Sequence, residues 1–166
     1  MSRLMRRQRG NRQKDLVGFR IGDVSYALDI HRVREILNPL PVVTLPQSPA
    51  AVLGVADHRG EVVPIVDLRS RFDLPPNPGP RRTKWIIVDR DGAGVGLVVD
   101  EVTDVFGAAS NDRRAVPSIS QADRRGIIAV YSYDSMLVFV LDPEILTDVT
   151  AALVAWTEER LLPGPR

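Results

Sequence analysis

The feature that most constrains this chain is a succession of short β-branched runs, each ended by a turn signal. The clearest pair is 52–56 and 61–66, separated by the turn Asp57-His58-Arg59-Gly60, in which Gly60 can adopt the positive φ that a hairpin needs. Frequent turns between short strands are typical of small barrels and disfavour a parallel sheet that alternates with long helices. We therefore predict an all-β fold with Arg59 at a hairpin tip.

The predicted strands form two groups on either side of a proline-rich segment. Residues 74–82 hold prolines, which cannot donate hydrogen bonds to a sheet, so this segment is predicted to be a connector. Two five-stranded β-barrels are implied, barrel one over about 15–72 and barrel two over about 83–141. The predicted strands are 16–21, 24–28, 42–45, 52–56 and 61–66 in the first group and 85–88, 95–99, 102–106, 127–131 and 137–141 in the second.

Helices are predicted to be few and short, and they begin at capping residues. Asp29 stands before an apolar stripe of helical period, which predicts a two-turn helix. Asp67 can accept backbone N–H bonds from a short helix over 68–72. The stripe after Asp29 consists of Ile30, Val33, Ile36 and Leu37.

Three further helical segments are predicted from caps and spacing. Ser48 starts a short turn that Gly54 closes, and Asp142 starts another turn with a proline behind it. The C-terminal stretch 148–166 carries apolar residues at helical spacing and is predicted to form a helix and tail. Trp156 is expected to pack this helix on a barrel, and contact with a partner is the alternative.

Charge is distributed unevenly along the chain. The formal net charge is +1, yet residues 1–14 contain six cations and no acid, so the remaining residues carry a net charge of −5. We predict a solvated, disordered arm over 1–14, and binding of nucleic acid or anionic lipid by this arm is the alternative.

Cysteine is absent, which excludes disulfides and thiolate metal sites and fits a reducing compartment. No apolar run has the length of a membrane span, and the first residues lack the apolar core of a secretory signal. We predict a cytoplasmic protein without direct membrane insertion.

Catalytic constellations are incomplete in this sequence. His31 and His58 are not spaced as a metal pair, so each is predicted to be a surface histidine. The glycines of 92–96 are not followed by a lysine with serine or threonine, which disfavours a phosphate loop. Residues 89–92 begin like a calcium loop but lack its further oxygen ligands. We predict a binding protein that is not an enzyme and uses neither a metal nor a cofactor.

The hairpin segment 54–69 carries a longer motif than its turn. It resembles the segment G-V-x-N-L-R-G-x-x-x-P-x-x-D-L-R of the CheW family of bacterial chemotaxis adaptors. Two positions depart from that segment, Asp57 in place of asparagine and His58 in place of leucine.

Other segments extend the resemblance over about 15–147. Residues 16–36, 95–105 and 126–142 are similar to the family's opening hairpin with its helix, to a later strand pair and to the closing hairpin. The resemblance implies two five-stranded SH3-like barrels with short helices and a C-terminal helix. It also implies a non-catalytic adaptor that couples chemoreceptors to a CheA-type histidine kinase and is a monomer outside the signalling array.

The resemblance also implies where the partners bind. In the family, an apolar groove between the barrels receives the cytoplasmic tip of the receptor, and the matching positions are Ile30, Val33, Glu35, Val95, Gly96, Val102 and Val105. The residues alone would assign those valines to the core by default.

Contact with the regulatory domain of the kinase is implied at two places. At the hairpin the matching positions are Gly54, Asp57 and Arg59. In a later loop they are Arg114, Pro117, Ser118 and Ile119, where Ser118 stands in place of an acid and Ile119 in place of an aromatic residue.

A nucleic-acid-binding module is the alternative function, because small barrels often bind oligonucleotides and the N-terminal arm is basic. The acidic body and an aromatic content of 5% argue against it, since single strands are held by cationic grooves and stacked rings.

Overall fold

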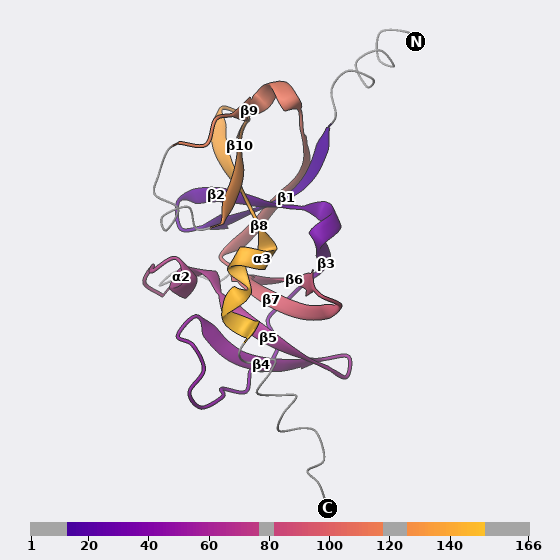
Figure 1. The fold of residues 1–166 in the computed structure, drawn as a ribbon, viewed down its shortest axis with the longest axis vertical. Coiled ribbons are helices and arrows are strands. Elements are labelled where there is room, and N and C mark those ends of the chain that lie inside the picture. Colours follow the sequence, from indigo (N-terminus) through magenta and orange to yellow (C-terminus); the bar gives the residue numbers. More distant parts are fainter. Residues whose placement is uncertain (1–12, 77–81, 118–125, 152–166) are drawn as a thin grey trace, which may run out of the picture.

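The computed structural model describes residues 13–76, 82–117 and 126–151, which form two β-sheets with a few short helices (Figure 1). Several predicted features lie outside the described residues: 1–12 of the basic arm, 77–81 of the connector, Ser118, Ile119, and 152–166 with Trp156. The predicted all-β class is confirmed.

Six strands form the first sheet, in the order β8-β1-β2-β11-β10-β9. Neighbouring strands are antiparallel, except that β2 and β11 run parallel. The strands are β1 (Lys14–Ile21), β2 (Val24–Asp29), β8 (Glu101–Ala108), β9 (Arg113–Arg114), β10 (Ile127–Tyr133) and β11 (Met136–Leu141).

Five strands form the second sheet, in the order β3-β6-β7-β5-β4. Its one parallel pair is β5 with β7. The strands are β3 (Val33–Leu37), β4 (Val52–His58), β5 (Glu61–Asp67), β6 (Lys84–Arg90) and β7 (Ala93–Val99).

The two sheets do not follow the division of the chain at the connector. β1 and β2 pair with β8 and β11, so the predicted grouping of the first five strands in one barrel and the last five in the other is wrong. In Figure 1 the indigo β1 and β2 lie in the same part of the molecule as the orange β10, and β11 pairs with both β2 and β10. Local patterns show that a strand forms, whereas its partner depends on which distant apolar faces fit together, here Leu16 and Ala27 against Val140.

The predicted two-turn helix after Asp29 is wrong beyond its first turn. η1 (Ile30–Arg32) is a short 3-10 turn, capped by the Asp29 carboxylate, which accepts a 3.0 Å hydrogen bond from the His31 N–H. The chain then enters β3, whose residues alternate between half-buried and exposed. Val33 and Ile36 are β-branched and favour strand geometry, and pairing with β6 supplies the hydrogen bonds that a helix would have made.

Two further predictions near β4 also fail. The predicted strand over 42–45 is a single bridge between Val43 and Val55. Gly54 does not close a turn, because β4 already begins at Val52. The turn itself exists, since the Val52 N–H donates to the Pro49 carbonyl over 2.9 Å.

The helices predicted after Asp67 and Asp142 are confirmed as short, capped turns. α2 (Leu68–Arg71) follows Asp67, whose carboxylate accepts a 3.1 Å hydrogen bond from the Arg69 N–H. α3 (Pro143–Leu146) follows Asp142, which caps it in the same way. Two 3-10 turns complete the elements, η2 (Ser110–Asp112) and η4 (Asp148–Thr150).

The core consists of three clusters. The largest lies between the sheets and joins side chains of both, such as Phe19 from β1 and Ile86 from β6. Each sheet also encloses a cluster of its own, around Val140 in the first and Ile65 in the second. Because full burial of one such side chain contributes roughly 2 kcal/mol, the shared cluster holds the two sheets together as one unit.

Candidate partner-binding surfaces

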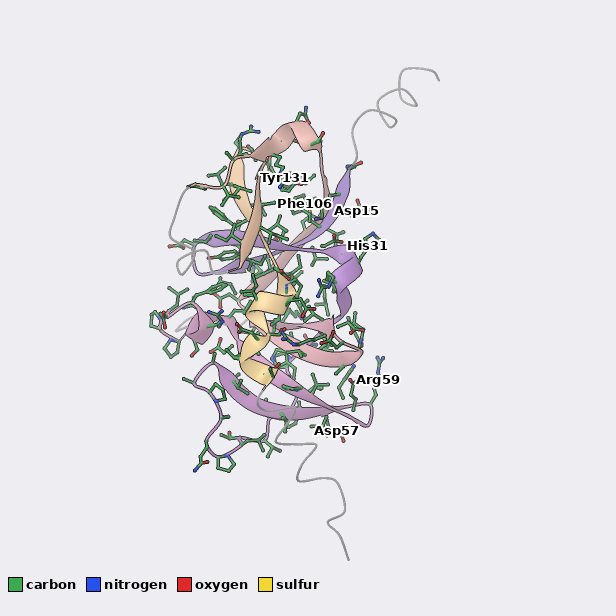
Figure 2. All side chains as sticks on the ribbon, in the orientation of Figure 1. Asp15, His31, Asp57, Arg59, Phe106 and Tyr131 are labelled. Carbon is green, nitrogen blue, oxygen red and sulfur yellow. The ribbon has the colours of Figure 1, made fainter. Side chains whose placement is uncertain are left out.

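The β4–β5 hairpin presents Arg59 to solvent as predicted. Arg59 has a φ of 54° and Gly60 a φ of 82°, so two residues in the left-handed region make the turn. The Gly60 N–H donates to the Asp57 carboxylate over 2.9 Å, which gives Asp57 a role in the turn itself. The Arg59 side chain is 76% exposed and lies at the outer edge of the molecule (Figure 2).

Glu35 of β3 ties this hairpin tip to the neighbouring strand. One carboxylate oxygen accepts a 3.0 Å hydrogen bond from Arg59 Nη2, and the other lies 2.9 Å from His58 Nε2. A carboxylate only accepts, so this ring nitrogen carries the proton. The bond with His58, helped by the charge of Arg59, holds the pKa of Glu35 below its ordinary value. Glu35, expected at the receptor groove, therefore lies beside the expected kinase contact.

A second set of charges contacts the hairpin at Glu61, the first residue of β5 after the turn. Arg34 Nη1 lies 3.1 Å from Glu61 and its Nη2 lies 3.2 Å from Asp89. Glu61 also accepts a 2.9 Å hydrogen bond from the Gly94 N–H. The bond with Asp89 is the main cause of the raised pKa of Arg34. These contacts join β3, β5 and the β6–β7 turn, so they keep the hairpin in place relative to its sheet.

Glycine is needed at position 54 for a structural reason that the sequence did not reveal. It is buried, with a φ of 146°, and a Cβ at this position would lie 2.1 Å from the Val43 carbonyl oxygen. Val43 and Val55 exchange backbone hydrogen bonds of 2.8 and 2.9 Å directly beside it. Gly54 thus permits the close approach of two backbone segments, and it offers no side chain to a partner.

The last two residues of the segment 54–69, Leu68 and Arg69, stabilise the fold. Leu68 is fully buried, and Arg69 makes bonds of 2.7 to 3.0 Å to both oxygens of Asp100, which also accepts a 2.7 Å bond from the Gly22 N–H. Burial opposes the charge of Asp100, yet the bonds from Arg69 and Gly22 hold its pKa below the ordinary value. Burial raises the pKa of Asp67. The Arg69–Asp100 pair joins α2 to the link between β7 of the second sheet and β8 of the first, and the bond from Gly22 extends this contact to the β1–β2 turn.

The predicted receptor-binding residues on the barrels differ in exposure and fall into buried, exposed and half-buried groups. Val95 is 2% exposed and Gly96 packs against Ile65, so neither lies on the accessible surface of this structure. Val105 is 54% exposed. The half-buried positions are Ile30, Val33 and Val102, and the last two pack against the core cluster between the sheets.

The second predicted kinase contact is only partly described. Arg114 and Pro117 are exposed, and Arg114 Nη1 donates to the Asn111 carbonyl over 3.1 Å. Ser118 and Ile119 lie outside the described residues.

The described part of the chain has neither a metal-binding cluster nor a membrane-spanning helix. No cluster of three or more acidic, histidine or cysteine side chains there could hold a metal ion. In the same residues, no helix is long and apolar enough to cross a membrane.

Similarity to known proteins decides the family. Residues 15–150 match the CheW-like domain. The chain belongs to the CheW-like domain family. The predicted role is thereby confirmed: this protein is a non-catalytic chemotaxis adaptor of the CheW family, which couples receptors to the kinase CheA.

Two relatives and one solved structure match over most of their length. The probable chemotaxis protein CheW of Rhizobium etli is 34% identical over 146 residues, which cover 86% of this chain and 92% of that protein. The chemotaxis protein CheW of Helicobacter pylori is 28% identical over 141 residues, or 81% and 86% of the two chains. The crystal structure of the scaffolding protein TtCheW from Thermoanaerobacter tengcongensis has a TM-score of 0.75 at 25% identity, and the match covers 82% of this chain and 93% of that one.

Proposed function

We propose that the adaptor binds the regulatory domain of a CheA-type kinase through Arg59 at the tip of the β4–β5 hairpin. The observation that carries this proposal is the combination of exposure and orientation: the Arg59 side chain is 76% exposed, and Glu35 holds it from one side over 3.0 Å. A guanidinium has five donors in a planar fork, so donors remain for a carboxylate or backbone carbonyl of a docked domain.

The receptor surface is proposed to lie around Val105, with Val102 and Val33 beside the shared core. Support comes from exposure, since Val105 is an apolar residue that is 54% exposed on a strand of the first sheet. Val33 of the second sheet and Val102 of the first pack against the same inter-sheet cluster. A receptor helix that lies along the junction of the two sheets would bury such side chains.

The same proposal places the protein in the cytoplasm, where it joins the membrane only through the receptors. Arg114 and Pro117 remain candidates for a second kinase contact, because both are exposed. The protein is proposed to be a monomer until it enters the array.

The kinase contact is tested by Arg59→Ala with Arg82→Ala as the control. Arg82 is a suitable match, since it is 81% exposed and also pairs with a glutamate, Glu101, over 3.3 Å. Isothermal titration with the kinase regulatory domain should show a loss of roughly tenfold in affinity for Arg59→Ala, which equals about 1.4 kcal/mol, and no change for Arg82→Ala. Equal affinities for the two variants would show that Arg59 does not contact the kinase and would favour Arg114 and its loop as the contact.

The receptor contact is tested by Val105→Asp with Val62→Asp as the control. Val62 is 53% exposed and lies on β5 of the second sheet, so both changes place a carboxylate at an equally exposed apolar position. We expect weaker binding to a receptor-tip fragment for Val105→Asp alone, with melting temperatures close to that of the wild type. Loss of binding in both variants would refute the proposed surface.

A further inference from the structure

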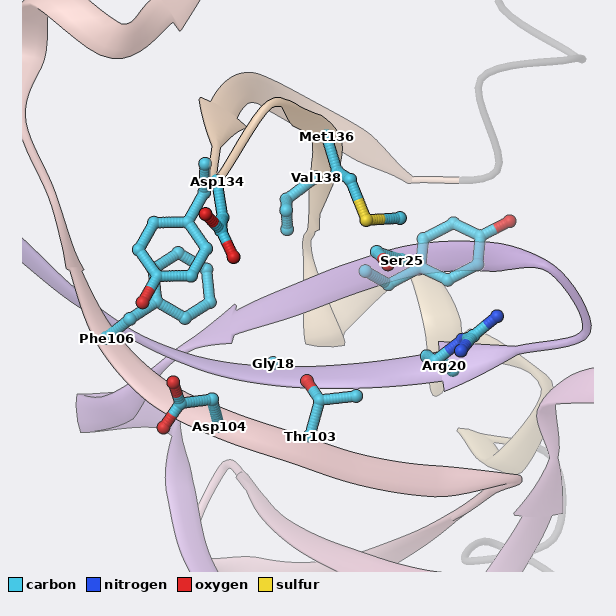
Figure 3. Close-up of a pocket in the computed structure, with 11 residues that line it drawn as sticks. Gly18, Arg20, Ser25, Thr103, Asp104, Phe106, Asp134, Met136 and Val138 are labelled. Carbon is cyan, nitrogen blue, oxygen red and sulfur yellow. The ribbon is translucent and has the colours of Figure 1, made fainter.

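A cavity of about 210 Å³ opens on the first sheet, lined by strands β1, β2 and β8 and by the β10–β11 hairpin (Figure 3). None of its lining residues belongs to the receptor or kinase positions named above. Its floor includes Gly18, where an added Cβ would lie 2.7 Å from the Thr103 hydroxyl, so the absence of a side chain keeps this part of the floor low.

The lining is largely apolar, and part of it is exposed. Tyr26, Phe106 and Val138 are between 5% and 8% exposed, and they form the deeper wall. Tyr133 is 38% and Met136 52% exposed at the rim, where the Tyr133 ring stacks on Phe106 with 4.1 Å between centroids. An apolar side chain placed in this hollow would remove the aromatic and thioether surface from water.

Charges of opposite sign stand at the two ends of the hollow. Figure 3 shows Asp104 and Asp134 at the end near Phe106, and Arg20 at the opposite end, beyond Met136. Among the described residues, these three side chains form no ion pair with one another or with other side chains. A ligand with a cation at one end, an apolar middle and an anion at the other matches this order.

We propose that the cavity is a docking site for a peptide segment of a protein partner in which an apolar side chain stands between a basic and an acidic residue. The apolar side chain enters the hollow beside Met136. The basic residue pairs with Asp104 and Asp134, and the acidic residue pairs with Arg20. Neither Arg59 nor Val105 lines the cavity, although Val105 lies between the lining residues Asp104 and Phe106 on β8.

Other ligands fit the same surface less well. A volume of about 210 Å³ holds a side chain, whereas sites for small molecules and cofactors usually have about 300 to 1,000 Å³. The two carboxylates disfavour a nucleic acid, whose phosphates require cationic partners. A peptide segment also agrees with the open rim, which leaves room for a backbone to pass.

The test uses the full-length protein and an array of synthetic nonapeptides. Each peptide has leucine, methionine or phenylalanine at the centre, a lysine or arginine on one side and a glutamate on the other, separated by glycine and serine. Control peptides carry two cations, two anions, or glycine at the centre. We expect binding to the mixed-charge peptides and at least fivefold weaker binding to all three controls.

Variants then locate the bound peptide. Met136 and Leu137 are adjacent and both 52% exposed, but only Met136 lines the cavity. Met136→Ser should weaken peptide binding at least fivefold and Leu137→Ser should leave it unchanged, with melting temperatures checked for both. Asp134→Asn should weaken the preference for a basic residue, and its turn is preserved because asparagine tolerates the positive φ of 52° at this position.

Three results would overturn the proposal. They are no binding by any mixed-charge peptide, equal binding by the control peptides, and equal losses for Met136→Ser and Leu137→Ser. Because Arg59 lies at the tip of the β4–β5 hairpin of the second sheet and does not line this cavity, Arg59→Ala should bind the peptides normally, so this test fails or succeeds independently of the kinase contact.

Discussion

Arg59 and Arg69 lie ten residues apart in one motif segment, and their surroundings are opposite. The Arg59 side chain is 76% exposed and shares Glu35 with a histidine, whereas Arg69 is 15% exposed and faces Asp100, which is 17% exposed. Exposed ion pairs contribute little to stability, but removing one partner of a buried pair leaves an uncompensated charge. One motif therefore combines an arginine suited to a partner with an arginine that supports the fold.

The difference follows from where the hairpin ends. Arg59 lies in the turn, where the chain leaves the sheet, and Gly60 beside it has open space around it. Arg69 lies in α2, directly after the buried Leu68, and bonds to Asp100, which joins β7 of the second sheet to β8 of the first. A substitution at the tip should thus alter binding, and one at the other end should alter folding.

Arg69→Ala is expected to have the largest effect on stability. It removes every bond from the guanidinium to Asp100 and leaves that carboxylate with the Gly22 N–H. Because breaking a buried pair by removing one partner is strongly destabilising, we expect a loss of about 3 kcal/mol in the free energy of unfolding, measured by urea denaturation. The double variant Arg69→Ala/Asp100→Asn should recover part of this loss. A wild-type denaturation curve for Arg69→Ala would contradict the contrast between the two arginines.

Gly54→Ala should have the next largest effect. The new Cβ would approach the Val43 carbonyl oxygen to 2.1 Å, and the φ of 146° is unfavourable for a residue with a side chain. We expect a loss of roughly 2 kcal/mol, read from thermal unfolding. Gly60→Asn is the control, because nothing lies within 4 Å of its Cβ and asparagine tolerates a φ of 82°. Equal losses at both glycines would contradict the structural role of Gly54.

The stability of the fold should depend on pH through Asp100, the partner of Arg69. The lowered pKa of Asp100 means that its charge stabilises the fold above the pKa of the unfolded chain, about 3.9, and that this contribution is lost as the pH falls through the folded value. Asp67 acts in the opposite direction, because its pKa is raised. The free energy of unfolding, measured by urea denaturation between neutral and acidic pH, should therefore fall less steeply for Asp100→Asn than for the wild type. Parallel slopes would show that Asp100 does not contribute.

Glu35→Gln should have the smallest effect on stability, with a melting temperature within about 2 °C of the wild type. It removes the charge that orients Arg59, so we expect about threefold weaker binding to the kinase regulatory domain and a reduced dependence of that binding on salt. Glu101→Gln, which touches the exposed Arg82, is the control. An unchanged kinase affinity for Glu35→Gln would show that Arg59 needs no orientation.

The local parts of the structure could be predicted because their causes lie within a few residues. The turn at Arg59 and Gly60, the caps at Asp67 and Asp142, and most strands follow from residue type and short spacing. The family resemblance rests on the same segment, since the motif residues form consecutive local elements. These features would be similar in many tertiary settings.

The placement of the site residues depended on distant contacts. Asp29 and the apolar residues after it have the spacing of a helix, but pairing with β6 made β3 a strand and brought Glu35 to Arg59. The burial of Val95 likewise comes from packing between the sheets.

By itself, the sequence determined most of the strands, the turns, the caps and the family, because these depend on backbone preferences and on neighbours along the chain. Only the tertiary structure decided that β1 and β2 join the sheet of β10 and β11, that Arg69 binds Asp100, and that Gly54 lies against Val43. Each of these contacts joins residues far apart in sequence. Its free energy comes from apolar surface and charge that become buried only when the whole chain has folded.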